Sequence, residues 1–265
     1  MFKDWSKVKM YDLTMNLNHM TPPWPTYEPL GVQYFKRLAP NGANGMIIKT
    51  SNHVGTHLDG PMHFDTGGRD IASLELEKLV GPGVVVDLSD IAEDWSIYTP
   101  QDIMDRVEVK KGDILFINTG YHKYSAEGSE PDERRYMLRH PGPSTDFPDW
   151  CKEMEIKYLA VDCGSADHPM NTKIRDWEPK EAEKCDAYMR EKYGKGLNEI
   201  YKWPDTYQCM HIWLFPKPWE CIHAECIGGE IDKVLNKRLI LGTFPWKFQY
   251  GESAFCRCVA FDVED

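Results

Sequence analysis

Residues 51–64 read SNHVGTHLDGPMHF, and they hold three of the nine histidines of the chain. The residues of metal-ligand type are His53, His57, Asp59 and His63, and every separation between them is even. In an extended chain all four side chains face the same way, whereas a helix would turn Asp59 well away from His53. Two glycines and a proline in the stretch also argue against a helix. We therefore expect an extended strand that aims these side chains at one point.

This set of side chains suits a catalytic metal ion. The imidazoles of His53 and His57 and the carboxylate of Asp59 fill three positions on Zn²⁺ or Mn²⁺ and leave others for water and substrate. The alternative is a group of surface or hydrogen-bonded histidines in a glycine-rich turn. Four ligand-type residues in phase within eleven positions favour the metal site.

The stretch resembles the HxGTHxDxPxHF signature of the cyclase-type metal-dependent hydrolases, a superfamily that includes bacterial kynurenine formamidase and isatin hydrolase. The match holds at His53, Gly55, Thr56, His57, Asp59, Pro61, His63 and Phe64. Further segments agree in order: Asp12-Leu13-Thr14, Pro22-Pro23-Trp24-Pro25, Gly112-Asp113-Ile114-Leu115, Asp162 with Ser165 and Asp167, and Phe244-Pro245-Trp246 through Val259. The resemblance implies a cyclase-like (swivelling β/β/α) fold: a single compact α/β domain with a mixed or barrel-like sheet and peripheral helices.

The resemblance also implies further site residues. In the formamidases a histidine in a late strand, followed by a glutamate, completes the site; here HIWLF supplies His211 and IHAECIGGEID supplies Glu225. Glu220 and His223 are alternatives to Glu225. If Asp59, His211 and Glu225 converge, a second ion can lie beside the first; otherwise the site is mononuclear. We expect one tightly held ion with His211 and Glu225 in its reach.

The expected function is a metal-dependent hydrolase that cleaves the C–N bond of an aryl formamide, lactam or cyclic amide with a metal-activated water. His63 is the first choice for the general acid/base, and His211 is the second, as a ligand or a proton shuttle. Glu225 would orient an imidazole or bind metal, or else form a structural ion pair with Lys233 or Arg238. The alternative function is a metal-dependent lyase or dehydratase that stabilises an enolate on the same scaffold.

Two aromatic residues are candidates for substrate contact. Trp24, flanked by prolines, suits stacking on an aryl amide, and packing at the surface is the alternative. Phe64 lies beside the predicted ligands, where packing beneath the site is the more frequent role. The polar stretches 121–147 and 171–207 are interpreted as insertions in one domain of residues 1–265. They form either surface loops or a lid and specificity wall.

Strand-like segments recur along the chain, many of them β-branched or aromatic and bounded by glycine, proline or aspartate. They cover residues 31–35, 45–51, 83–88, 113–119, 158–162, 210–215, 238–244 and 255–261. Helices are expected at residues 71–79 with Asp70 as the cap, and at 99–107, 146–154 and 179–193. Irregular alternation of more strands than helices indicates a mixed α/β domain.

The amino-acid composition argues against nucleic-acid-binding and membrane-spanning proteins. The 265 residues include 31 basic and 42 acidic side chains, for a net charge of −11, with 42% hydrophobic residues. The acidic balance argues against nucleic acid as a partner. No apolar stretch approaches the roughly 20 residues that cross a bilayer.

The expected setting is the cytoplasm. Residues 1–13 show no export signal, and the eight cysteines form no CxxC pair, so we expect reduced, mostly buried thiols. The expected partners are a small-molecule substrate, no membrane, and a second copy of the chain in a homodimer or higher homo-oligomer. That oligomer is implied by the resemblance and by the aromatic arm around Trp24, which would reach a partner's site, and two-fold dimers are the commonest closed assemblies.

Overall fold

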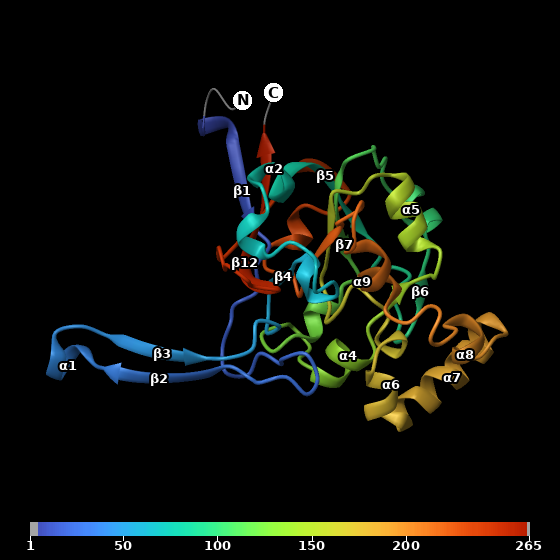
Figure 1. The fold of residues 1–265 in the computed structure, drawn as a ribbon, viewed down its shortest axis with the longest axis horizontal. Helices are drawn as coiled ribbons and strands as arrows, with labels where there is room; N and C mark the ends of the chain where they lie inside the picture. Colours follow the sequence, from blue (N-terminus) through green and yellow to red (C-terminus); the bar gives the residue numbers. More distant parts are fainter. Residues whose placement is uncertain (1–4, 264–265) are drawn as a thin grey trace.

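A closed sheet of seven strands forms the centre of the computed structural model, which describes residues 5–263. The strand order is β4-β12-β11-β5-β7-β9-β10, and β10 pairs with β4 to close the ring, while β1 extends the sheet along β12 (Figure 1). The pairs β5–β7, β7–β9 and β9–β10 are parallel, and the remaining pairs are antiparallel. The expected single α/β domain with a mixed, barrel-like sheet is confirmed.

The elements have the following bounds. The strands are β1 (Val8–Asp12), β2 (Gly31–Lys36), β3 (Gly45–Lys49), β4 (His57–Asp59), β5 (Val80–Asp87), β6 (Ile97–Tyr98), β7 (Ile114–Asn118), β8 (Gly142–Pro143), β9 (Tyr158–Val161), β10 (Ile222–Glu225), β11 (Lys237–Pro245) and β12 (Ser253–Val263). The α-helices are α1 (Leu38–Asn41), α2 (Leu76–Leu79), α3 (Pro100–Met104), α4 (Glu133–Leu138), α5 (Phe147–Glu153), α6 (Ile174–Trp177), α7 (Pro179–Tyr193), α8 (Leu197–Ile200) and α9 (Cys209–Leu214).

Alternation along the strands places the candidate site outside the closed sheet. All seven strands contribute one face to a buried apolar cluster that includes Leu58 of β4 and Ala224 of β10. The neighbouring residues His57, Asp59 and Glu225 therefore point to the opposite face. That outer face is where helices pack, so the sheet supplies part of the site and a helix supplies the rest.

The strand predicted at residues 210–215 is wrong, because this segment forms helix α9. Met210, Leu214 and the following Phe215 are fully buried, whereas Ile212 is 38% exposed, which is helical periodicity. A short apolar run in a buried helix cannot be told from a buried strand by hydrophobicity alone. His211 thus reaches the site from a helix.

The single extended strand predicted for residues 51–64 is also wrong. Only His57–Asp59 is a strand, and a 3₁₀ turn at Pro61–His63 follows it. Before the strand the chain turns at Gly55, whose φ of 63° lies in the left-handed region that glycine adopts without strain. A Cβ at this position would lie 3.1 Å from the Leu17 side chain.

The other expected strands are confirmed, and so are the helices α3, α5 and α7, with ends that differ by a few residues. Thr99 caps α3 in a capping box with Asp102. The expected helix at 71–79 is instead a 3₁₀ turn capped by Asp70 and the single turn α2. The backbone of Leu74 between them is extended, because its side chain packs into the interior cluster.

Hairpin β2–β3 with α1 between its strands, called the arm below, extends away from the body (Figure 1). Cross-strand pairs Val32–Ile48 and Tyr34–Met46 place four apolar side chains on one face. All four are between 46% and 50% exposed. The arm therefore presents an apolar face that no other part of residues 5–263 covers. A two-stranded hairpin alone is only marginally stable in water.

All eight cysteines are free and buried, as expected. Among residues 5–263 no helix is long and apolar enough to span a bilayer. Residues 1–4, part of the segment in which no export signal was found, lie outside the described residues.

Neither of the stretches 121–147 and 171–207 adds a strand to the closed sheet. Glu181 of α7 links the two stretches through ion pairs. Its buried carboxylate accepts hydrogen bonds from Arg139 Nε at 2.7 Å and from Arg134 and Lys184. Burial by itself favours the protonated acid, but these three cations lower the pKa of Glu181 from 4.5 to about 2.

Replacement Glu181→Gln is expected to lower the free energy of unfolding at pH 7 by about 1–3 kcal/mol. A carboxylate with a depressed pKa stabilises the fold above its unfolded pKa, and this contribution is lost as the pH falls towards the folded pKa. The difference between wild type and variant should therefore shrink to less than half at pH 3. Urea unfolding at several pH values measures it, and a difference that does not depend on pH would contradict the assignment.

Candidate metal centre

Three predicted ligands meet at one point on the outer face of the sheet. His57 and Asp59 share a face of β4, and the turn at Gly55 brings His53 back beside them. His53 Nδ1 lies 3.1 Å from His57 Nε2 and 3.1 Å from Asp59 Oδ1, and the third side of the triangle is 3.4 Å. All three residues are buried. The structure thus brings together the residues that the even spacing indicated.

The hydrogen bonds around this triangle fit a bound cation. His57 Nδ1 donates to the carbonyl of Gly55 at 2.8 Å, and His53 Nε2 faces Glu252 Oε2 at 3.0 Å. In the neutral imidazoles the other two nitrogens therefore offer lone pairs to the centre of the triangle. Asp59 Oδ1 is buried and has no hydrogen-bond partner in residues 5–263. Two imidazole nitrogens and a carboxylate oxygen at such distances form a donor set for a divalent transition metal.

Thr56 fixes the backbone between the ligands. Its hydroxyl donates to the carbonyl of Cys226 at 2.6 Å and accepts from the backbone N–H of Met15 at 3.0 Å. Both partners belong to other parts of the chain, so the ligand strand is anchored on two sides. The orientation of the two imidazoles is therefore set before any ion binds.

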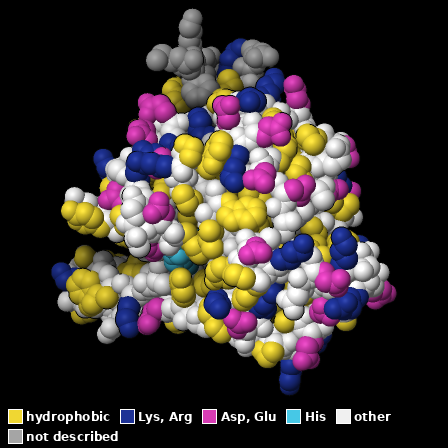
Figure 2. All heavy atoms as spheres, turned by 45° about the vertical axis from the view of Figure 1, so that its right-hand side comes forward, with side chains coloured by type: hydrophobic (Ala, Val, Ile, Leu, Met, Phe, Trp, Pro, Cys, Tyr) yellow, Lys and Arg dark blue, Asp and Glu magenta, His cyan; other side chains and the backbone are white. Residues whose placement is uncertain are grey.

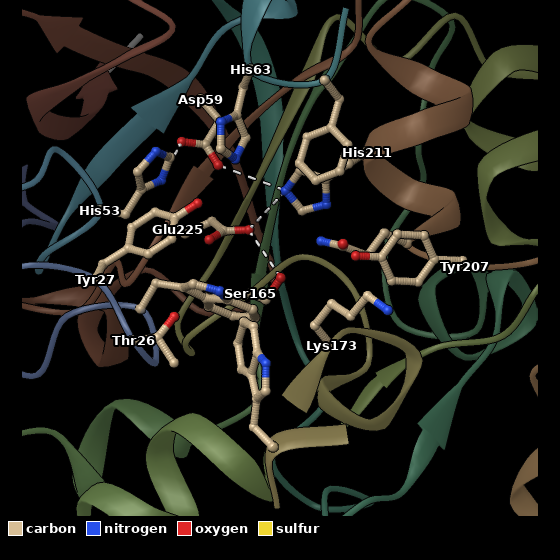
Figure 3. A pocket seen from close by; sticks show the side chains of 14 residues that line it. Thr26, Tyr27, His53, Asp59, His63, Ser165, Lys173, Tyr207, His211 and Glu225 are labelled. Atoms are coloured by element: carbon tan, nitrogen blue, oxygen red, sulfur yellow. Dashed lines mark hydrogen bonds and ion pairs between the residues drawn. The ribbon is translucent and has the colours of Figure 1, made fainter. Parts of the chain in front are cut away.

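His211 and Glu225 lie beside the first group (Figure 3). Together with His223 they form a second group that could hold a metal ion. His211 Nε2 lies 3.4 Å from Glu225 Oε1 and 3.7 Å from Asp59 Oδ2. Glu225 Oε2 lies 3.7 Å from His57 Nε2. The two groups therefore meet at Asp59, as the resemblance implied.

Of the two alternatives for Glu225, Glu220 has a partner elsewhere, whereas His223 lies beside the site. Glu220 binds Arg69 at 3.0 Å. The cations proposed as structural partners of Glu225 are engaged elsewhere, Lys233 with Glu230 and Arg238 with Asp113. Glu225 itself accepts from the backbone N–H of Ala166 at 2.8 Å. His223 is fully buried next to His211, and neither of its ring nitrogens has a partner in the described residues.

Two carboxylates that orient the site histidines were missed in the sequence. Asp167 Oδ2 lies 2.6 Å from His211 Nδ1 and leaves Nε2 of that ring facing Glu225 and Asp59. Asp167 belongs to the D-x-x-S-x-D stretch that is part of the family resemblance. That stretch is the sequence signal by which Asp167 could have been found. Glu252 had no such signal, because it follows His53 by 199 residues and reaches it only through the pairing of β12 with β4.

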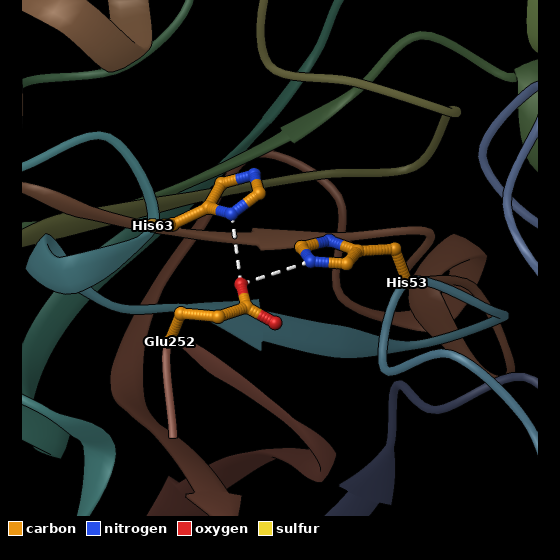
Figure 4. Close-up of side chains that lie close together, drawn as sticks. All are labelled: His53, His63 and Glu252. Carbon is orange, nitrogen blue, oxygen red and sulfur yellow. Dashed lines mark hydrogen bonds and ion pairs between the residues drawn. The ribbon is translucent and has the colours of Figure 1, made fainter. Parts of the chain in front are cut away.

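Glu252 connects a predicted ligand to the predicted acid/base group (Figure 4). Its Oε2 lies 3.0 Å from His53 Nε2 and 2.8 Å from His63 Nδ1, and its Oε1 accepts from the hydroxyl of Ser253. Burial opposes ionisation of Glu252, but the two imidazoles hold its pKa well below the usual range. The carboxylate therefore fixes both rings, and it leaves His63 Nε2 free of this contact.

Replacement Glu252→Gln is expected to weaken metal binding by about 10–100-fold, the usual effect of losing a partner that orients a ligand. Turnover should fall as well, since a neutral amide is a weaker acceptor than the carboxylate that orients His63. Competition with a chelating dye measures the affinity, and Glu75→Gln at the exposed partner of Arg69 is the matched control. Unchanged metal affinity in Glu252→Gln would contradict this role.

The ionisable groups of the centre shift one another's pKa values. Burial disfavours ionisation of Asp59, but His53 and His57 hold its pKa well below the usual range. Burial also disfavours the imidazolium of His53, yet Asp59 and Glu252 raise the pKa of His53 to about 10. Burial lowers the pKa of His57. The site thus concentrates negative charge around positions that a cation can take.

A cavity of about 330 Å³ opens onto this centre, and Figure 2 shows histidine side chains in a hollow of the surface. Both predicted contact residues, Trp24 and Phe64, line it. The Phe64 ring also packs 4.9 Å from the His211 ring, so it supports the site as well. Trp24 lies in the cavity of its own chain, with its backbone N–H bonded to the carbonyl of His53.

Comparison with known proteins agrees with this architecture. The family model named Cyclase matches residues 11–168, more than half of the chain. The chain belongs to the cyclase family. Cyclase-like protein 1 of Arabidopsis thaliana is 31% identical over 202 residues, which are 68% of this chain and 74% of that protein.

One further relative and one solved structure carry the names of enzymes. Kynurenine formamidase of Bacillus anthracis is 26% identical over 166 residues, which are 62% of this chain and 73% of the relative. The structure of isatin hydrolase A from Ralstonia solanacearum matches with a TM-score of 0.73 at 20% identity, and the match covers 98% of this chain and 93% of that one. The likeness to isatin hydrolase A shows a shared fold.

Proposed function

We propose that this cyclase-family protein is a metal-dependent hydrolase that cleaves the C–N bond of an aryl formamide, lactam or cyclic amide. The observation that carries the proposal is the convergence of His53, His57 and Asp59, with an unpartnered carboxylate oxygen, beside a cavity with aromatic walls. The reactions of kynurenine formamidase and isatin hydrolase, both hydrolyses of aryl-amide bonds, support the substrate class.

His53, His57 and Asp59 would hold one divalent ion, Mn²⁺ or Zn²⁺. When bound, such an ion polarises a carbonyl oxygen and makes water a nucleophile near neutral pH. His211 and Glu225 lie within reach of the same position, since both approach Asp59 or His57 within 3.7 Å. These distances favour a role for the pair in holding the ion or the reacting water.

His63 is the proposed general acid that protonates the leaving nitrogen. Its Nδ1 is held by Glu252 at 2.8 Å, and the ring lines the cavity next to the ligands. An imidazole fixed at one nitrogen by a carboxylate presents the other for proton transfer. His211, fixed in the same way by Asp167, is the second proton-transfer group.

Incubation of the metal-loaded protein with formanilide, N-formylkynurenine, isatin and a cyclic imide tests the reaction. Hydrolysis adds one water and breaks the C–N bond, which mass spectrometry in H₂¹⁸O detects as an ¹⁸O label in the acid product. A lyase or dehydratase would form or consume an alkene with the C–N bond intact. That outcome would replace the proposed function by the alternative one.

We also propose a homodimer in which each copy covers the arm of the other. Residues 31–49 contain three basic and no acidic residues, whereas the whole chain carries a net charge of −11. A basic arm with an uncovered apolar face is complementary to the acidic body of a second copy. The arm, in place of Trp24, is therefore the segment that reaches the partner.

Replacement Ile48→Glu, on the apolar face of the arm, is expected to convert a dimer into a monomer, since a charge would be buried against the acidic partner. Light scattering should give twice the 30.7 kDa of one chain for the wild type and a single chain mass for the variant. Gln33→Glu, on the other face of the same hairpin, is the control. A monomeric wild type at micromolar concentration would overturn the dimer.

Residues 1–265 are proposed as one domain with insertions at 121–147 and 171–207, since neither stretch supplies a strand of the closed sheet. The cytoplasm is the proposed location. Eight free, buried thiols support a reducing compartment.

A further inference from the structure

We propose that the cavity wall formed by Lys173 and Gln208 is a carboxylate-binding subsite, so that the substrate is an aryl amide with a carboxylate at the end away from the metal centre. The inference rests on the proposed function for the identity of the amide, and on the structure of the wall for the carboxylate. Both residues line the cavity. Neither belongs to the group of predicted ligands or acid/base residues.

The Gln208 side chain faces the cavity. The residue as a whole is 8% exposed, but its amide atoms are not among the buried polar atoms that lack a partner, so the amide group reaches the open space of the cavity. An amide in this position can both donate and accept hydrogen bonds. Because this side chain lines the cavity, a ligand in the cavity is the partner that can pair it.

The backbone at Gln208 is strained, which is a second sign of function. Its φ of 40° and ψ of 49° are in the left-handed region, which costs a residue with a side chain of this length about 1 kcal/mol or more. Hydrogen bonds hold this conformation, from its N–H to the carbonyl of Asn171 and from the N–H groups of His211 and Ile212 to its own carbonyl. The turn that positions His211 therefore also directs Gln208.

Lys173 supplies the positive charge. Among the described residues that line this cavity it is the one lysine or arginine, whereas Asp59 and Glu225 are negative. Figure 3 shows its ammonium group on the side of the cavity where Tyr207 lies. Its Nζ lies 3.1 Å from Asp176 in a half-exposed ion pair, 5.3 Å from the Trp203 ring centre and 5.9 Å from the Tyr207 ring centre. A carboxylate at the wall would therefore share the ammonium group with Asp176.

The hydrogen-bond donors of Lys173 and Gln208 indicate which chemical group of a ligand would bind at this wall. An ammonium and an amide N–H both donate hydrogen bonds, and a carboxylate accepts from both. The rings of Trp24, Trp177 and Tyr207 also line the cavity and provide stacking surfaces for an aryl group. An aryl amide would therefore place its amide at the ligands and its carboxylate at Lys173.

Steady-state kinetics of the metal-loaded protein test the subsite with formanilide and its 2-, 3- and 4-carboxylate derivatives. In Lys173→Met the KM of the preferred carboxylate derivative should rise about tenfold or more, while kcat and KM for formanilide change less than twofold. Lys173→Arg should restore most of the affinity. Gln208→Asn, which suits the left-handed backbone but shortens the amide, should also raise that KM.

The control is Lys180→Met, which removes an exposed lysine from the neighbouring helix α7 and should leave every KM unchanged. Equal effects of Lys173→Met on formanilide and on its carboxylate derivatives would overturn the subsite. So would an unchanged KM for all of them.

A binding measurement separates the subsite from the proposed reaction. Benzoate and its neutral analogue benzamide are titrated into the metal-loaded protein and followed by tryptophan fluorescence, which needs no turnover. Lys173→Met should weaken benzoate about fivefold or more and leave benzamide unchanged. If this holds but no amide is hydrolysed, the subsite stands and the proposed function fails. If benzoate binds both proteins equally, the subsite is wrong whatever the reaction.

Discussion

Replacement His57→Ala is expected to abolish metal binding and amide hydrolysis together. The imidazole of His57 is held at both nitrogens. Its Nε2 faces His53 and Asp59, and its Nδ1 donates to the carbonyl of Gly55. Removing the imidazole leaves two of the three donors and an unpaired carboxylate in a buried position. Replacements His53→Ala and Asp59→Ala should have the same outcome for the same reason.

Elemental analysis of protein purified without chelator measures the metal content, and the hydrolysis assay measures activity on the same samples. His19→Ala, which removes an exposed histidine outside the site, is the matched control and should keep both. Circular dichroism of each variant checks that it is folded. Wild-type metal content in His57→Ala would show that the assignment of the ligands is wrong.

Replacement His63→Ala is expected to keep the metal while kcat falls by roughly 10²–10⁴, the range that a general acid/base contributes. His63 is not one of the three predicted donors: its Nδ1 binds Glu252 and its ring packs 4.4 Å from the His53 ring, so its loss leaves the three donors in place. A substrate with a better leaving group should recover part of the rate, because a stable leaving anion needs no proton.

Three results distinguish the possible roles of His63. Metal loss in His63→Ala would make it a ligand. Full activity with the metal retained would show that His63 takes no part in the reaction, and His211 would then be the proposed acid/base group. A lowered kcat that does not respond to the leaving group would contradict proton donation.

The convergence of His53, His57 and Asp59 could be predicted because it depends on residues close in sequence. The prediction succeeded although the backbone is not one extended strand. Within β4 the period of two holds for His57 and Asp59, and the turn at Gly55 returns His53 to the same side. Local sequence therefore indicated which side chains converge better than it indicated the backbone conformation.

Residues that act over long sequence distances could not be predicted in this way. Glu252 approaches His53 because β12 pairs with β4, a contact between segments about 200 residues apart. The segment of helix α9 reads as a strand because an apolar run of six residues carries no periodic signal. Gln208 has no signal in the sequence, since its left-handed backbone conformation depends on the fold around it.

We propose that this chain hydrolyses an amide with a divalent ion held by His53, His57 and Asp59. A titration of chelator-treated protein with Mn²⁺ or Zn²⁺, in which bound metal and hydrolysis of formanilide or isatin are measured together, tests this proposal. We expect no activity without metal, and activity that rises in proportion to bound ion and levels off at one ion per chain. Undiminished hydrolysis by protein without measurable metal would contradict the claim, and so would fully loaded protein that cleaves no C–N bond.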